Sequence, residues 1–158
     1  MELKLNDDKV RELIATYKRF PKIASNNMRL GMRKALLDVQ GKARREHRFT
    51  TRTGQLEKAI KYEVKQGFPI TGLIGINKKD AYYGKYVHDG TGPHIIIPRK
   101  KKALRFEIGG VPFVRTKVRH PGIKADPFLV SAFENSRFNI IRRFEEAIDN
   151  AVREANLG

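Results

Sequence analysis

Apolar side chains recur at helical spacing along the first 48 residues of the chain. Residues 6–20 predict a helix, and we expect Pro21 to interrupt or kink it because proline lacks a backbone donor. Residues 22–48 predict a second, long helix with one apolar face and one basic face. The apolar face consists of Met28, Met32, Ala35, Leu36, Val39 and Ala43.

The pattern then changes to the period of two that is typical of β-strands. Thr53 is expected to cap a short helical turn that ends at Ile60. After this turn, Ile60, Tyr62 and Val64 alternate with charged residues, and residues 70–76 return after a turn at 66–69. We therefore expect an antiparallel pair of strands between residues 60 and 76.

The stretch from residue 80 to residue 118 predicts a short helix, a brief strand and a hairpin. The helix spans residues 80–89, the strand covers 95–97, and a basic loop follows at 99–102. Residues 103–108 and 111–118 form the hairpin, closed by Gly109-Gly110, a two-residue loop suited to a primed turn. This loop pairs Phe106 with Phe113 on a face that we expect to be buried. The neighbouring predicted pairs are Leu104 with Arg115 and Ile108 with Val111.

Asp126-Pro127 predicts the start of the last helix, with Asp126 as its cap and Pro127 at its first helical position. The expected apolar stripe of this helix is Phe133, Ile140, Ile141, Phe144, Ile148, Ala151 and Val152. The whole chain therefore predicts an α+β fold, with one small antiparallel β-sheet packed against long N-terminal and C-terminal helices. We expect a single domain over residues 1–158, in which 1–20 are a candidate arm and 21–158 the main unit.

Composition restricts the chemistry that the chain can perform. It has no Cys, which excludes disulfides and thiolate metal sites. The N-terminus lacks an apolar leader, and no run approaches the ~18 apolar residues of a membrane span. We therefore expect a soluble protein made in a cytoplasm, with no membrane partner.

Charge adds a second expectation, because 33 Lys and Arg stand against 17 Asp and Glu, a net charge of +16. Two clusters carry much of it. Residues 21–60 hold ten bases and three acids, and residues 96–125 hold nine bases and one acid, Glu107. A surplus of this size favours a polyanionic neighbour, which could be nucleic acid, an acidic protein surface or an anionic membrane.

The sequence contains few candidate catalytic or metal-binding residues. Three of the four histidines, His88, His94 and His120, lie near Asp89 in the central stretch, but they lack any regular metal-ligand spacing. The Gly90-Thr91-Gly92 loop lacks the frame of a phosphate-binding loop and is typical of a turn. We expect turn histidines bonded to backbone, no enzyme activity, no cofactor, no metal and no small-molecule substrate.

Nonspecific nucleic-acid binding is the alternative function that the residues suggest. The bases of residues 99–105 lie near Phe106 and Phe113, as in a phosphate-contacting loop beside a stacking face. No helix-turn-helix, RNA-recognition or zinc pattern accompanies them. The hairpin register also turns the two Phe side chains toward the face that we expect to be buried.

Several motifs together resemble one family. They are Tyr82-Tyr83-Gly84-x-Tyr86-Val87-x-x-Gly90-Thr91-Gly92-Pro93, Ile97-Pro98, Lys102-Ala103-Leu104-x-Phe106, Val118-x-His120-Pro121-Gly122-x-Lys124-Ala125-x-Pro127-Phe128-Leu129, and Thr53-Gly54-x-Leu56-x-x-Ala59-Ile60. In this order and spacing the chain resembles the neck and tail-completion, or minor tail component, proteins of long-tailed bacteriophages. The resemblance covers roughly residues 20–155. Its structural motif residues are Gly90, Thr91, Gly92, Pro93, His94, His120, Pro121, Gly122, Pro127 and Phe128.

The resemblance implies a non-enzymatic structural protein of the virion tail or neck, assembled in the host cytoplasm. Such proteins act in tail completion or head–tail joining as rings that stack on other neck or tail proteins. A ring of six or twelve copies would suit a head-to-tail contact that closes. Phage DNA passes along the axis of such rings and is a further partner of the basic residues.

We expect the loop 99–102 to project from the sheet and to contact a neighbouring subunit, an adjoining ring or DNA. The reason is that this loop is basic, is bounded by Pro98 and has no apolar residue to bury. The candidate interaction residues are Arg99, Lys100, Lys101, Lys102, Arg105, Arg115, Lys117 and Arg119.

Overall fold

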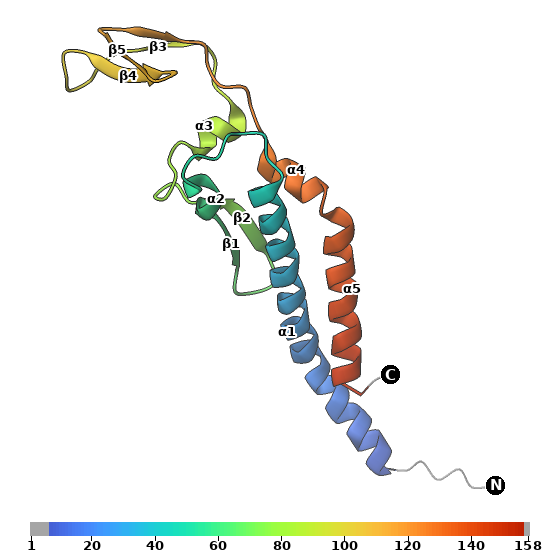
Figure 1. The fold of residues 1–158 in the computed structure, drawn as a ribbon. Coiled ribbons are helices and arrows are strands. Elements are labelled where there is room, and N and C mark those ends of the chain that lie inside the picture. Colours follow the sequence, from blue (N-terminus) through green and yellow to red (C-terminus); the bar gives the residue numbers. More distant parts are fainter. Residues whose placement is uncertain (1–6, 157–158) are drawn as a thin grey trace.

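The structure is a computed structural model that describes residues 7–156. It consists of two parts, a long helical body and a small β lobe beyond one end of the body (Figure 1). The helical body comprises residues 7–89 and 126–156, and the β lobe comprises residues 94–120. Two short segments, residues 90–93 and 121–125, join the parts, and we call them the neck.

Helix α1 (Asp7–Arg45) runs the length of the body as one helix of 39 residues, with Pro21 inside it. The predicted interruption at Pro21 is therefore wrong, and the helix ends three residues before the expected position. Proline removes one hydrogen bond from the ladder. A separate second helix would need a new and costly nucleus, and residues 19–24 contain no cap signal to start one. Continuing the helix through Pro21 therefore costs less free energy than starting a second one.

Helix α5 (Arg137–Glu154) packs along α1 through small side chains. A Cβ atom on Gly31 of α1 would lie 3.0 Å from the Ala147 Cβ and 3.0 Å from the Arg143 carbonyl oxygen. Because the helices approach so closely, the buried face of α5 is lined by Ala147 and Ala151. The predicted apolar stripe is wrong in part, since Ile141 and Ile148 are 58% and 52% exposed.

The core of the body lies where the C-terminal half of α1 meets three short helices and one strand. These are α2 (Gln55–Ala59), β1 (Ile60–Val64), α3 (Gly84–Asp89) and α4 (Phe128–Glu134). Strand β1 pairs antiparallel with β2 (Gly72–Ile76), as predicted, and this pair packs on α1. The buried cluster consists of Val39, Ala43, Leu56, Ala59, Ile60, Ala81, Phe128 and Ala132.

The β lobe contains two further antiparallel pairs. β3 (His94–Ile96) pairs with β6 (Val118–His120), and β4 (Leu104–Ile108) pairs with β5 (Val111–Arg115). The hairpin register is confirmed, with Phe106 opposite Phe113. The α+β class is also confirmed, but the strands form three two-stranded sheets instead of one.

The face of the hairpin that carries the two Phe residues is only half-buried. Their rings stack on each other with centroids 5.8 Å apart. The expectation of a buried face is therefore wrong, because this hairpin lies in the β lobe, away from the long helices (Figure 1). Within residues 7–156, no helix is long and apolar enough to cross a membrane.

A basic lobe on a narrow neck as the candidate functional site

The neck brings together two segments that lie about 30 residues apart in the sequence. The Thr91 amide donates to the Ile123 carbonyl at 2.9 Å, and the Ile123 amide donates to the Thr91 carbonyl and hydroxyl, each at 3.0 Å. Gly122 has φ +94°, and a Cβ there would lie 2.2 Å from the Thr91 oxygen. No larger residue fits this crossing without moving the backbone.

Two histidines close the lobe side of the neck. His94 and His120 are partners in the β3–β6 pair, and their rings stack with centroids 5.0 Å apart. His94 Nδ1 lies 3.0 Å from the Gly92 carbonyl oxygen, and His120 Nδ1 accepts the Gly122 amide at 3.0 Å. The prediction of backbone-bonded turn histidines is confirmed for these two. Among residues 7–156 no three His, Asp or Glu side chains gather as metal ligands.

The body side of the neck is held by Asp126 and Phe128. The Asp126 carboxylate accepts the backbone amides of Arg48 and Phe49 at 2.6 and 2.9 Å, so it joins the end of the α1 region to the neck. The prediction that Asp126 caps α4 is wrong, because no side chain caps this helix. Pro127 is the residue before the helix and not its first residue. Phe128 is fully buried, with its ring edge-on to Phe49. Pro127 and Phe128 therefore belong to the body rather than to an exposed site.

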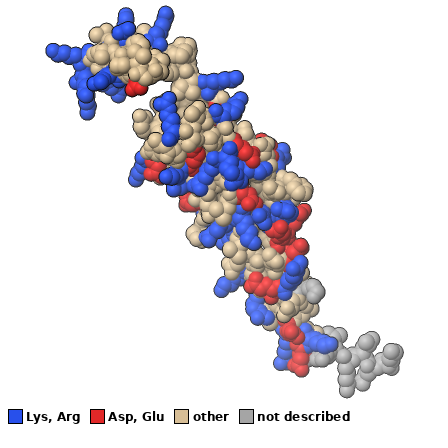
Figure 2. All heavy atoms as spheres, viewed as in Figure 1, with Lys and Arg blue, Asp and Glu red and all other residues tan. Residues whose placement is uncertain are grey.

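All eight predicted interaction residues lie in the β lobe and are exposed. Four occupy the loop between β3 and β4, and the others lie on or beside β4, β5 and β6. Blue side chains project from this lobe in several directions, with a single red patch among them (Figure 2). The residues are Arg99, Lys100, Lys101, Lys102, Arg105, Arg115, Lys117 and Arg119.

Several bases of the body are used internally. The Arg29 guanidinium donates to the Lys65 and Gly67 carbonyls at 3.1 and 2.8 Å, which ties the β1–β2 turn to α1. The Arg44 guanidinium donates to two carbonyl oxygens of the α2–β1 region at 2.9 and 3.0 Å. These side chains stabilise the fold and are not available to a partner.

One body arginine is held by two carboxylates. The Arg143 Nε donates to the Asp38 carboxylate at 2.9 Å, which pairs α5 with α1, and its Nη1 donates to Glu146 at 3.2 Å. The hydrogen bond to Asp38, followed by the one to Glu146, raises the pKa of Arg143 above its ordinary value. The side chain stays charged and stays on the helix pair.

The β lobe shows the opposite behaviour. Within residues 7–156, none of its eight bases forms an ion pair with a carboxylate. Arg115 donates to the carbonyl of its neighbour Val114 and lies 5.7 Å above the Phe113 ring. The positive charge of the lobe is therefore uncompensated and faces solvent.

An apolar cleft of about 430 Å³ separates the two β pairs of the lobe. The residues that line it include Ile96, Leu104, Phe106, Ile108 and Val118, with Arg105 and Arg119 also in its wall. Sequence reasoning missed this cleft because it arises from the failure of the lobe strands to join one sheet. The nearest sequence signal is the run Ile95–Ile97, of which Ile95 and Ile97 are more than 60% exposed.

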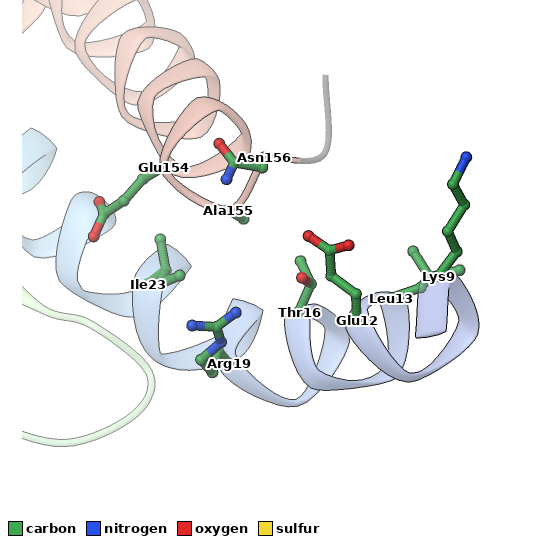
Figure 3. A pocket seen from close by; sticks show the side chains of 9 residues that line it. All are labelled: Lys9, Glu12, Leu13, Thr16, Arg19, Ile23, Glu154, Ala155 and Asn156. Carbon is green, nitrogen blue, oxygen red and sulfur yellow. The ribbon is translucent and has the colours of Figure 1, made fainter. Parts of the chain in front are cut away.

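Two more hollows lie on the body and were also not predicted. One, of about 410 Å³, forms where α1 continues past the end of α5, between Glu12, Thr16, Ile23 and Glu154 (Figure 3). The other, of about 550 Å³, is apolar and runs beside Pro21, Met28, Met32, Phe68 and Phe144. Both exist because α1, at about 58 Å, is roughly twice as long as α5 or the sheet that covers it.

Comparisons of the chain with models of known protein families, with curated proteins and with solved structures find no match. The resemblance to phage neck and tail proteins therefore stays a prediction that rests on the order and spacing of its motifs. The structure gives those motifs a location. Gly90–His94 and His120–Gly122 meet at the neck, and Pro127-Phe128 anchor the neck in the body.

Proposed function

We propose that this protein is a non-enzymatic structural component of the neck or tail of a tailed bacteriophage. In this proposal it acts in tail completion or head–tail joining as a homo-oligomeric ring that contacts adjoining ring proteins. The motif resemblance supplies the biological setting, and the exposed surface of the chain supports the assembly.

The observation that carries the proposal is the amount of surface that the single chain leaves exposed. The chain exposes 12,632 Å² at a mass of 18.1 kDa. A compact monomer of this mass exposes about 8,100 Å². The excess, about 4,500 Å², is comparable to the area that obligate oligomers bury at their interfaces. The eight undescribed terminal residues are too few to supply it.

The exposed apolar residues lie in stripes on the two long helices. On α5 the stripe consists of Phe138, Ile141 and Ile148, and on the first turns of α1 it consists of Leu13, Ile14 and Tyr17. These stripes are different surfaces, so a contact between them on neighbouring subunits would be heterologous. A heterologous contact that closes on itself generates a ring.

The β lobe suits a contact with an adjoining ring. It lies beyond the end of the helical body, so that packing of body against body leaves it accessible (Figure 1). Its apolar edge, which includes Ile95 and Ile97, is exposed alongside its bases. A ring built from the bodies would therefore present several such lobes on one side.

Size-exclusion chromatography with multi-angle light scattering tests the ring. Six or twelve copies of an 18.1 kDa chain give about 109 or 217 kDa. The Ile141→Glu variant places a charge on the α5 stripe and is expected to run at the monomer mass. The matched control, Leu73→Glu on the exposed side of β2, is expected to keep the wild-type mass. A monomeric wild-type protein, or a ring that survives Ile141→Glu, would contradict the proposal.

A further inference from the structure

We infer that the β lobe binds the phosphate backbone of double-stranded DNA without reading its base sequence. The inference concerns the lobe alone and goes beyond ring formation. It stands or falls independently of the oligomeric state of the helical body.

The first argument is the density of uncompensated charge. The lobe, residues 94–120, carries eight bases and one acid, a net charge of +7 out of the +16 of the whole chain. None of the lobe bases has a carboxylate partner within residues 7–156. Concentrating this many like charges on a small lobe is electrostatically unfavourable until a polyanion neutralises them.

Second, another copy of the same chain has no helix pair with an excess of negative charge to match the lobe. Residues 137–154 of α5 contain four acids and four bases, and residues 7–45 of α1 contain four acids and eleven bases. Several of the acids, such as Asp38 and Glu146, are already paired with arginine. Neither long helix of a second copy has a net negative charge to offer the lobe.

The third argument is the distribution of the bases around the lobe. They come from the loop 99–102, from both strands of the hairpin and from β6, and they point in several directions (Figure 2). A flat acidic protein face would neutralise only one side of such a set. Duplex DNA carries one charge per ~1.7 Å of its axis and needs no fixed partner geometry.

The aromatic residues favour duplex over single-stranded DNA. Single-stranded DNA is held by aromatic rings that present a free face to the bases. In the lobe, the Phe106 and Phe113 rings stack on each other and are half-buried, and Phe106 also lines the apolar cleft. The two rings are therefore occupied by each other, and the Lys and Arg side chains of the lobe remain to contact phosphates.

Fluorescence anisotropy with a labelled 25-base-pair duplex of mixed sequence tests the inference, in KCl from 50 to 300 mM. The lobe variant is Arg99→Gln, Lys100→Gln and Lys101→Gln together. Its matched control is Lys61→Gln, Lys65→Gln and Lys78→Gln together, three exposed lysines of the body. If all three loop bases contact phosphates, the slope of log K against log salt falls by about 2.7 in the lobe variant. We expect at least a tenfold loss of affinity for the lobe variant and less than threefold for the control.

Three results would overturn the inference. They are equal losses in the lobe variant and the control, no binding by the wild-type protein at 50 mM KCl, and tighter binding to a polyglutamate peptide than to the duplex. Binding that differs strongly between two duplex sequences would contradict the claim that bases are not read. Light scattering on the same samples separates the two proposals. A monomer with lobe-dependent DNA binding rejects the ring alone, and a ring without DNA binding rejects this inference alone.

Discussion

The helical body and the β lobe contain basic clusters of similar size, and several bases of the body cluster are tied to distant parts of the chain. Residues 21–60 have a net charge of +7 from ten bases and three acids, and residues 96–125 have +8. In the body, Arg29, Arg44 and Arg48 donate to carbonyls or to Asp126. In the lobe, the bases have no carboxylate partners among residues 7–156. Charge density alone therefore does not show how a basic cluster is used.

Burial follows the same division. In the body, Phe128 and Ile60 are completely shielded from solvent. In the lobe, the apolar residues around the cleft are only half-buried or exposed. A lobe with so little core gains its order from the neck and from the strand pairs themselves. The buried core therefore lies in the body, and the lobe contributes little buried apolar surface.

The largest effect is expected from Phe128→Ala, which removes a fully buried ring from the body core. Truncation of a buried Phe costs about 3–5 kcal/mol of unfolding free energy, because both transfer energy and cavity energy are lost. Phe113→Ala, at the half-buried ring of the lobe, should cost under half as much. Urea denaturation followed by circular dichroism measures both. Equal costs would mean that the lobe has a core of its own.

A somewhat smaller effect is expected from Gly122→Ala at the neck. Its Cβ would meet the Thr91 oxygen at 2.2 Å, and the residue has φ +94°. Gly110→Ala is the matched control, with φ +83° and no atom within 4 Å of the added Cβ. Backbone strain alone costs about 1–2 kcal/mol, and Gly122→Ala should cost at least twice the control. Hydrogen exchange should accelerate at the amides of Thr91 and Ile123. If both variants exchange alike, the close crossing at the neck is not important for stability.

Replacing one arginine in each region compares the two basic clusters directly. Arg44→Ala removes two hydrogen bonds from a charged donor to carbonyls of the α2–β1 region, at a cost of about 1.5–3 kcal/mol. Arg119→Ala, at an exposed base on β6, should change the unfolding free energy by no more than about 0.5 kcal/mol. Thermal and urea unfolding of both variants would measure the difference. A destabilised Arg119→Ala protein would show that the lobe bases have a structural role.

The smallest effect on stability is expected from changing Arg99, Lys100 and Lys101 together to Ser, because these side chains are exposed and unpaired. Stability should stay within about 0.5 kcal/mol of the wild type. In phage particles the same variant should lower yield or infectivity. Unchanged yield and infectivity would reject the loop as a contact surface, whatever its charge.

Much of the fold could be predicted from the sequence because it depends on local rules. The period of two predicted the β1–β2 pair, and the Gly109-Gly110 turn predicted the register that places Phe106 opposite Phe113. The site was predicted in part. The bases of the loop 99–102 were expected to be exposed and are, and His94 and His120 were expected to bind backbone and do.

Three other features differ from what the sequence predicted. Pro21 lies inside one helix because a continuous ladder avoids a second nucleation. Ile141 and Ile148 are exposed because Gly31 and Ala147 draw α1 and α5 together on another face. Asp126 holds the backbone of Arg48 and Phe49 because the fold brings their amides to its carboxylate.

The sequence by itself determined where strands, turns and charge would lie, since periodicity and turn chemistry act over a few residues. Only the tertiary structure decided that Gly90–His94 and His120–Gly122 would meet as a neck. It also decided that Arg44 of the body would donate to backbone carbonyls while Arg99 of the lobe would face solvent. The physical reason is that the partners of an arginine are the groups that the fold brings near it, and these cannot be read from its neighbours in the chain.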